Sequence, residues 1–251
     1  ITALPRESKT VIKTAIHAGD CHATHEKITV CCCGIGNKNA LEAAKKLVNK
    51  WNCNFLISWG SAASLENSLK PGTLLLPDCV VDEEGNEYPV PEKPLELIKN
   101  LVNDKIGWVS MRHGQVNKML KNKDDKTGLH KLTHSVSADM ESAAIAGFAK
   151  KSGVPFLVIR AVSDSPEIEI PEAVTNYTTP EGDIRFWKFA FSLFMNPMQI
   201  PKIYRLADGF GKAMSTLEKT AEFLFPDFLN EMDNLPDLTK KKIKPSINFI
   251  S

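Results

Sequence analysis

The chain has 251 residues, of which 43% are hydrophobic and 24% are charged, proportions typical of a soluble globular protein. With 31 basic and 30 acidic side chains, the net charge of +1 creates no field of one sign that would indicate nucleic-acid binding. No signal peptide is visible and no apolar run reaches the ~18 residues of a spanning helix, so we expect a cytoplasmic protein. The chain starts at Ile1 without an initiator methionine, and we expect native residues to precede it.

The chain contains six cysteines, three of which are consecutive at Cys31, Cys32 and Cys33. Adjacent residues of a strand point to opposite faces, so this run suits neither a simple disulfide nor a zinc site. We expect the cysteines to pack as small apolar residues in a reducing compartment, with a metal site as the weaker alternative. The sequence thus predicts no metal and no cofactor.

Strands and helices alternate along the first two thirds of the chain. Apolar, β-branched runs predict buried strands at residues 27–33, 54–59, 72–81 and 155–162. Apolar residues at helical spacing predict helices at 37–51, which Asn37 would cap, and at 140–151, which Gly153 would end. The alternation predicts one three-layer α/β/α domain around a mixed, mainly parallel sheet.

The pattern changes after about Ser165. Residues 165–183, rich in Pro, Glu and Thr, predict a loop, and residues 186–194 are dense in aromatic side chains. Residues 199–225 predict one or two amphipathic helices beginning near Pro201, while the charged segment 227–251 is expected to be partly disordered. We therefore expect an α/β domain at 1–185 and a helical extension at 186–251 packed on it.

Two small-residue segments follow predicted strands. Gly34 and Gly36 occupy a strand–helix junction, but a dinucleotide-binding loop needs a third glycine where Asn39 stands, which disfavours a nicotinamide-dependent oxidoreductase. The segment Gly60-Ser61-Ala62-Ala63 predicts a turn whose backbone N–H groups hold a phosphate or a water oxygen. The alternative is that these small residues only let a helix pack closely on the sheet.

Arg160 interrupts an otherwise apolar strand. A buried cation needs a carboxylate partner or a ligand, and Glu141 and Asp164 are the plausible partners. By themselves, Asp139 and Glu141 could merely complement a helix dipole, and Asp164 could be only a turn residue.

These residues lie in two segments, DMESAA at 139–144 and VPFLVIRAVSD at 154–164, that resemble the signature of the nucleoside phosphorylase/nucleosidase superfamily. The chain is most similar to the branch of methylthioadenosine/S-adenosylhomocysteine nucleosidases and futalosine hydrolases. The segments TALPRE at 2–7, GIGN at 34–37, GSA at 60–62 and PG at 71–72 fit the family in the same order. The resemblance covers residues 1–165 and implies a domain of the nucleoside phosphorylase type.

The resemblance implies a role for each polar residue of the two segments. Asp164 matches the general acid that protonates the departing purine at N7, and Ser163 would orient it. Glu141 matches the carboxylate that holds the ribose hydroxyls, with Met140 packed against the sugar. Arg160 would pair with nearby carboxylates.

The attacking group decides between hydrolysis and phosphorolysis. Glu7 stands where the hydrolases of the family carry a catalytic glutamate, and a carboxylate would activate water and repel phosphate. Arg6 keeps phosphorolysis open, since its guanidinium could bind phosphate as a co-substrate. Ala63 and Ser64 replace the family's usual glycines and narrow the water or anion niche.

The C-terminal part suggests the substrate. Residues 195–207 resemble the tail of hopanoid-associated phosphorylases, which are proposed to release adenine from the lipid adenosylhopane. Five aromatic residues would then face a lipid tail or a membrane surface: Phe186, Trp187, Phe189, Phe191 and Phe194. They could instead pack on the domain or form a dimer contact. The loop after Asp164 does not resemble the lid of the methylthioadenosine enzymes.

The sequence therefore predicts an enzyme that uses water or phosphate to cleave the N-glycosidic bond of an adenine nucleoside. The C-terminal resemblance suggests that this nucleoside is linked to a lipid. A methylthioadenosine/S-adenosylhomocysteine or futalosine nucleosidase is the alternative, and a non-catalytic nucleoside-binding protein is the alternative of another class. We expect a homodimer or higher homo-oligomer, with peripheral membrane contact through 186–207 and no nucleic-acid partner.

Overall fold

The computed structural model describes residues 1–2, 7, 22–25, 28–171, 174 and 195–233. The central sheet consists of β3 (Leu56–Ser64), β4 (Leu74–Leu75), β5 (Cys79–Val81), β6 (Glu87–Pro89), β7 (Trp108–Val109), β8 (Arg112–Gln115), β9 (Ser137–Asp139) and β10 (Phe156–Asp164). These eight strands are ordered β6-β5-β8-β9-β3-β10-β4-β7. Parallel pairs join β10 to β3, β8 to β9, β5 to β8 and β4 to β7, so the sheet is mixed and mostly parallel, as predicted.

A second, two-stranded sheet pairs β1 (His22–His25) with β2 (Ile28–Cys31) in antiparallel register. The first two residues connect it to the central sheet. The Ile1 carbonyl accepts from the Trp59 N–H at 2.8 Å, and the Thr2 N–H donates to the Cys31 carbonyl at 3.0 Å. The start of the chain therefore lies between β2 and β3.

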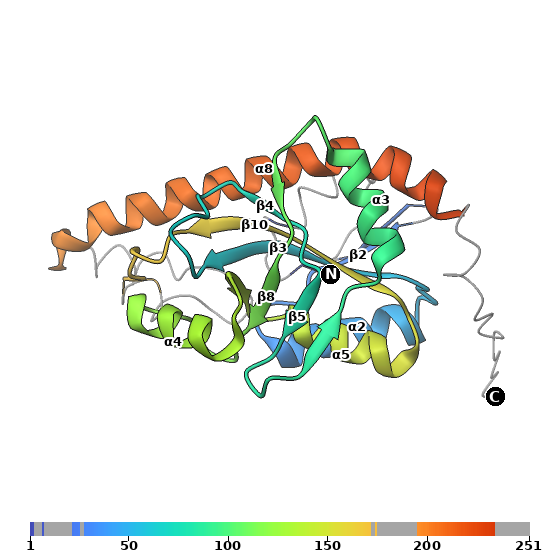
Figure 1. The fold of residues 1–251 in the computed structure, drawn as a ribbon, viewed down its shortest axis with the longest axis horizontal. Coiled ribbons are helices and arrows are strands. Elements are labelled where there is room, and N and C mark those ends of the chain that lie inside the picture. Colours follow the sequence, from blue (N-terminus) through green and yellow to red (C-terminus); the bar gives the residue numbers. More distant parts are fainter. Residues whose placement is uncertain (3–6, 8–21, 26–27, 172–173, 175–194, 234–251) are drawn as a thin grey trace.

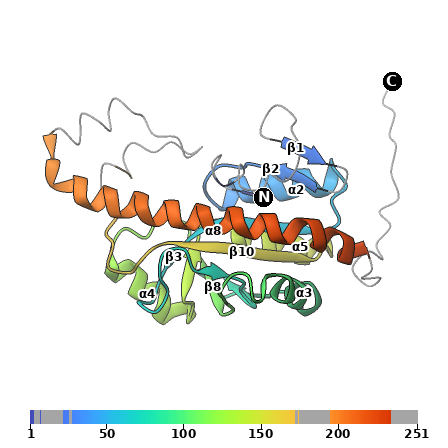
Figure 2. The ribbon, with the colours of Figure 1, turned by 90° about the horizontal axis from the view of Figure 1, so that it is seen from above.

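Helices cover both faces of the central strands. They are α2 (Asn37–Asn49), α3 (Glu92–Val102), α4 (Lys123–Thr133), α5 (Ser142–Ser152) and α8 (Ile200–Asp233), with a 3-10 turn at Pro197–Gln199. Figure 1 shows α8 above β3 and β10, and α2 with α5 beneath them. Seen from above, α8 runs along β10 and its N-terminal part extends beyond the sheet (Figure 2). This is the predicted three-layer arrangement.

The core lies where α8 crosses β3 and β10. The helix buries one apolar face, comprising Ala213, Leu217, Ala221 and Leu224, against the sheet. Trp59 of β3 packs on Phe225 with ring centroids 5.5 Å apart. Burial of a large apolar side chain stabilises a fold by about 1.5–3 kcal/mol, so this interface fixes the two strands that carry the site. Within the described residues, no helix is both long and apolar enough to span a bilayer.

Two sequence predictions about the strands are wrong. The predicted turn at Gly60–Ala63 lies inside β3, because β10 continues to pair with it as far as Ala63. The predicted strand at 72–81 is two strands, β4 and β5, since Pro77 between them has no N–H for a ladder hydrogen bond.

The helix ends were predicted with mixed success. Gly153 ends α5 with φ of 64°, as expected for a left-handed C-terminal residue. Gly36, rather than Asn37, precedes the first turn of α2, and the Asn37 side chain instead donates to Asn117 Oδ1 at 2.7 Å.

The predicted C-terminal helix is the single helix α8. It continues to Asp233, so residues 227–233, expected to be partly disordered, are helical. The aromatic segment 186–194 and residues 234–251 lie outside the described part of the chain. The domain boundary at 185 stays a prediction.

Candidate active site

A bulge in β10 directs Asp164. The strand pairs with β3 from Phe156 opposite Leu56 to Val162 opposite Ala62, and the register then shifts so that Asp164 faces Ala63. Ser163 occupies the extra position, where its hydroxyl donates to the Ala62 carbonyl at 3.1 Å. Ser163 therefore orients Asp164 through the backbone bulge, and its side-chain hydrogen bond goes to β3.

Asp164 is buried, with 2% of its surface exposed. Its Oδ1 accepts from the Ser64 N–H at 3.3 Å, and its Oδ2 lies 2.5 Å from Lys126 Nζ. Burial raises the pKa of Asp164 above its ordinary value, and the Lys126 ammonium offsets part of this rise. A carboxyl group in this setting is suited to hold a proton and then to release it.

Lys126 is a site residue that the sequence analysis does not predict. It lies on the inner face of α4, which also buries Leu129 and Thr133. Their i, i+3, i+7 spacing marks one helical stripe, so a lysine within it was a detectable signal of the same kind as Arg160 within its strand.

Arg160, 1% exposed, pairs with the expected Glu141 and also with Asp139, which was not expected. Its Nη2 lies 2.6 Å from Asp139 Oδ2 and 3.8 Å from Glu141 Oε2, and it donates to Ser58 Oγ at 2.6 Å. The predicted pairing with Asp164 is wrong. Asp164 comes four residues later on the same strand, about 13 Å away at ~3.3 Å per residue, and its carboxylate is bound to Ser64 and Lys126 instead.

Asp139 accepts hydrogen bonds at the start of α5 and also forms an ion pair with Arg160. Its Oδ1 accepts from the N–H groups of Glu141 at 3.1 Å and Ser142 at 3.0 Å, at the start of α5. Its Oδ2 contacts Arg160 and lies 3.2 Å from His113 Nε2. Burial alone would raise the pKa of Asp139, but Arg160 and then His113 hold it well below its ordinary value. Asp139 is therefore a fixed negative charge beneath the site.

Glu141 is held at 5% exposure between α5 and the loop before α2. Its Oε1 accepts from the Gly36 N–H at 2.8 Å. Burial and then the Asp139 charge raise the pKa of Glu141 to about 7, against the lowering effect of Arg160. The glycine loop that invited a dinucleotide interpretation thus binds a carboxylate of this chain.

Glu7 reaches the same region from the N-terminal segment and is 1% exposed. Its Oε1 accepts from the Ser61 N–H at 2.8 Å and from Ser61 Oγ at 2.7 Å. Among the described residues, Ile1 hydrogen-bonds β3 at Trp59 and β9 pairs with β3 from Ala63 onward, and the Ser61 N–H lies between these two contacts. The donor expected to hold phosphate or water therefore binds Glu7.

Gly60 allows Glu7 and Arg160 to approach each other. A Cβ at Gly60 would lie 2.4 Å from Arg160 Nη1 and 2.7 Å from Glu7 Oε2, so a side chain there would displace the guanidinium or the carboxylate. The small residues of β3 thus accommodate the ion-pair cluster, and the alternative of helix packing does not explain Gly60.

Comparison with known proteins places the chain in a family. A sequence profile of the Phosphorylase superfamily matches residues 5–181. The chain belongs to this superfamily. The 5'-methylthioadenosine/S-adenosylhomocysteine nucleosidase of Staphylococcus haemolyticus is 30% identical over an alignment of 155 residues, which covers 52% of this chain and 65% of the relative. That of Staphylococcus aureus is 29% identical over 152 residues, with the same coverage of 52% and 65%. The match spans slightly less than two thirds of these relatives' length.

Two solved structures of other proteins share the fold. The 5'-methylthioadenosine/S-adenosyl homocysteine nucleosidase of Helicobacter pylori aligns with a TM-score of 0.66 at 16% identity, over 92% of this chain and 96% of that one. Futalosine hydrolase of the same organism aligns with a TM-score of 0.66 at 17% identity, over 92% and 95%. The predicted nucleoside phosphorylase type of fold is confirmed.

The other predicted site residues lie around the carboxylates of this superfamily member. Met140 is half-buried and packs against the cluster formed by Leu65, Val116, Leu129 and Ala138. Ala62 is buried and Ala63 half-buried at the end of β3. Arg6, the predicted phosphate ligand, lies outside the described residues.

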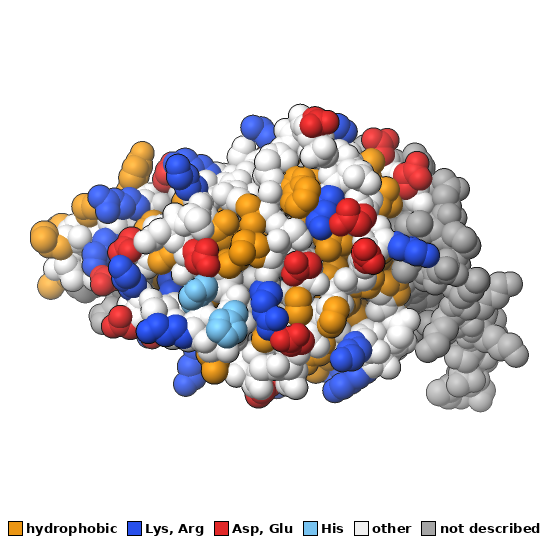
Figure 3. All heavy atoms as spheres, viewed as in Figure 1, with side chains coloured by type: hydrophobic (Ala, Val, Ile, Leu, Met, Phe, Trp, Pro, Cys, Tyr) orange, Lys and Arg blue, Asp and Glu red, His pale blue; other side chains and the backbone are white. Residues whose placement is uncertain are grey.

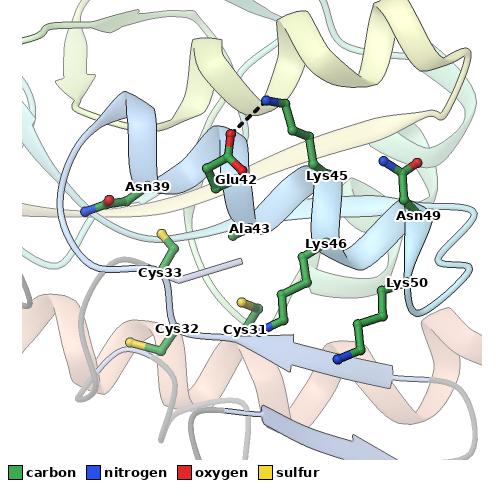
Figure 4. A pocket seen from close by; sticks show the side chains of 10 residues that line it. All are labelled: Cys31, Cys32, Cys33, Asn39, Glu42, Ala43, Lys45, Lys46, Asn49 and Lys50. Carbon is green, nitrogen blue, oxygen red and sulfur yellow. Dashed lines mark hydrogen bonds and ion pairs between the residues drawn. The ribbon is translucent and has the colours of Figure 1, made fainter.

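A separate hollow lies between β2 and α2 of this superfamily member (Figure 4). The described residues that line it include Cys31, Cys32, Cys33 and the lysines Lys46 and Lys50, and none of the carboxylates discussed above. Burial raises the pKa of the Cys33 thiol to about 12, and Cys33 Sγ donates to the Gly34 carbonyl at 3.1 Å. The thiol is therefore a poor nucleophile, and Cys31 packs in the core, as predicted for a small apolar residue.

Proposed function

We propose that this protein cleaves the N-glycosidic bond of a purine nucleoside. The observation that carries the proposal is the set of three buried carboxylates, Glu7, Glu141 and Asp164, each at most 5% exposed. Glu7 is anchored at Ser61 and Asp164 at Ser64 of the same strand. At ~3.3 Å per residue these anchors are about 10 Å apart, a spacing on the scale of a nucleoside. The superfamily membership supports the same activity.

Each carboxylate has a distinct task in this proposal. The bond between C1' and N9 breaks, its electron pair moves onto the purine, and Asp164 delivers a proton to N7. The buried setting that raises the pKa of Asp164 favours its protonated form before this step. Ionised Glu141 accepts hydrogen bonds from the ribose hydroxyls and stabilises the positive sugar.

We propose that water, and not phosphate, attacks C1'. Glu7 would take one proton from the water molecule while the water oxygen bonds to C1'. Glu7 and Glu141 lie near Arg160, whose charge Asp139 already balances, so the described part of the site offers a phosphate dianion little net attraction. Arg6 is the residue that would support phosphate as a co-substrate. The reaction needs no further cofactor.

For the substrate we propose an adenine nucleoside with a large 5' substituent, lipid-linked as in adenosylhopane. The curated relatives named above act on 5'-substituted adenosines, as their names state. A lipid substituent would suit a protein with an apolar surface near its site. A 5'-methylthioadenosine, S-adenosylhomocysteine or futalosine substrate is the alternative.

We propose that the start of α8 contacts the membrane that holds such a substrate. Met195, Met198, Ile200 and Tyr204 are between 51% and 83% exposed. Hydrophobic side chains gather at the tip where α8 begins, on the left of Figure 3. The variant Met198→Ser/Tyr204→Ser should sediment less with anionic phospholipid vesicles than the wild type. Leu132→Ser, which changes an exposed leucine on α4, is the control. Equal sedimentation of all three proteins would contradict membrane contact.

We also propose that the protein forms a homodimer or higher homo-oligomer. Trp51 and Met111, at 41% and 45% exposure, are large apolar side chains that a second copy could cover. Light scattering after size exclusion measures the mass, and a monomer at all concentrations would contradict the proposal.

One assay tests the activity and its class. The protein is incubated with adenosine, inosine and 5'-substituted adenosines, with and without phosphate, and free base is measured. We expect adenine release that does not depend on phosphate and that Asp164→Asn abolishes. Asp208→Asn, which changes an exposed carboxylate paired with Lys212, should keep full activity. Phosphate dependence would overturn hydrolysis. Binding of adenosine analogues without release of base would indicate a nucleoside-binding protein instead.

A further inference from the structure

Lys126 is a fully buried ammonium group with three acceptors. Its Nζ donates to Asp164 Oδ2 at 2.5 Å, to the Ser165 carbonyl at 2.9 Å and to the Ile168 carbonyl at 3.3 Å. The side chain is 0% exposed and that of Asp164 is 3% exposed. Three N–H donors thus meet three oxygens, which is the full hydrogen-bonding capacity of a protonated lysine.

Other charged groups near Asp164 have partners elsewhere. At the end of β3, Glu66 Oε1 lies 3.8 Å from His130 Nε2. In the loop after β10, Glu167 pairs with Lys123 at 2.8 Å. On α8, Asp208 pairs with Lys212, and Arg160 with Glu141 belongs to the cluster around Asp139. Lys126 is the charge that acts on Asp164 among the described residues.

We propose that Lys126 is a positioning residue for Asp164, which fixes Oδ2 and balances the negative charge left on the carboxylate once its proton has moved to the leaving purine. This rests on the proposed function. Oδ2 accepts the short hydrogen bond from the Lys126 ammonium, whereas Oδ1 accepts only the longer one of 3.3 Å from the Ser64 N–H, so we assign the transferable proton to Oδ1. The proton leaves Oδ1 for N7 as the C1'–N9 bond breaks, and the pair ends as aspartate and ammonium, with no net change in charge on Lys126.

The same ammonium fixes the loop that follows the acid. Ser165 and Ile168 are bound through their carbonyls, and the Ile170 N–H donates to the Lys121 carbonyl at 2.9 Å, just before α4. The position of Asp164 and of this loop therefore depends on α4, an element that the sequence motifs do not include.

The test compares the neutral variants Lys126→Met and Lys126→Gln with Lys123→Met. Lys123 lies on the same helix and bridges to the same loop, but its ion pair with Glu167 is exposed, so it is a matched control. Without the ammonium, Asp164 holds its proton more tightly and is a weaker acid. We expect kcat to fall by about 10-fold or more. The basic limb of the kcat profile should move to higher pH in both Lys126 variants and remain in place in Lys123→Met.

A direct titration separates this inference from the proposed function. The carboxyl carbon of Asp164, labelled with carbon-13 and assigned by its absence in Asp164→Asn, is followed by NMR against pH. It should titrate at higher pH in Lys126→Met and Lys126→Gln than in the wild type or Lys123→Met. An unchanged titration and an unchanged basic limb would overturn the role of Lys126. A wild type that releases no base would overturn the proposed activity, while the titration would still decide the role of the ion pair.

Discussion

Gly209 of α8 lies directly against the backbone of Ser163: a Cβ added to Gly209 would be 2.2 Å from the Ser163 carbonyl oxygen. Ser163 is the bulge residue that directs Asp164, so the helix that covers the sheet also supports the proposed acid. The contact is to backbone, which cannot rotate away as a side chain can.

Gly209→Ala should therefore displace α8 or the bulge. Overpacking of this kind destabilises a protein by about 1–3 kcal/mol, which urea denaturation would measure. Base release should fall as well, because Asp164 moves with the bulge. In Gly211→Ala the new methyl group meets no atom within 4 Å, and the variant should be stabilised by up to ~1 kcal/mol through helix propensity. Equal stability of the two variants would contradict the close contact.

Arg160→Met should leave Asp139 buried without its cation. Loss of one partner from a buried pair costs about 3–5 kcal/mol. Arg160 holds the pKa of Asp139 below its ordinary value, so the pair contributes stability above about pH 3.8, the ordinary value, and loses it as the pH falls. The difference between wild type and variant should therefore be largest near neutral pH and shrink in acid. Arg112→Met, which removes the exposed pair with Glu87, should cost about 0–1 kcal/mol at any pH.

Glu141 should make both activity and stability depend on pH near neutrality. Its pKa of about 7 means that the ionised form needed to bind ribose is lost as the pH falls below 7, and kcat/KM should fall with it. Since the folded chain keeps a proton that the unfolded chain releases, Glu141 should lower stability as the pH rises from 4.5 to 7. The slope is at most about 1.4 kcal/mol per pH unit. Denaturation of Glu141→Gln should lack this slope, and that of Glu96→Gln, an exposed control, should retain it.

Glu7→Gln should separate binding from attack. The amide oxygen can still accept both hydrogen bonds from Ser61, so an adenosine analogue should bind with unchanged affinity by calorimetry. Without a base for the water, kcat should fall by about 10²–10⁴-fold. Glu42→Gln, on a surface carboxylate paired with Lys45, should behave as wild type. An unimpaired Glu7→Gln enzyme would remove Glu7 from the reaction.

Much of the fold was readable from local patterns. The apolar period distinguished helices from strands, and Gly153 marked the end of α5 through its left-handed backbone. The predicted strand boundaries were wrong where pairing with a neighbouring strand, and not the local amino-acid composition, decides how far a strand extends. Small residues at Gly60–Ala63 resemble a turn, yet their partner strand β10 keeps them extended. A strand's length depends on its neighbour, which the local sequence does not contain.

The sequence by itself indicated Arg160, Glu141, Asp164 and Glu7 as candidate site residues, but not Lys126. Arg160 within an apolar strand had to find a counter-charge, and Glu141 and Asp164 stood out beside it. Only the tertiary structure decided which charges pair. Arg160 binds Asp139, Asp164 binds Lys126, and Glu7 binds Ser61 across more than fifty residues of chain. Ion pairing requires side-chain atoms within about 4 Å, and such proximity depends on strand register, the Ser163 bulge and the packing of α4 and α8, which no single segment encodes.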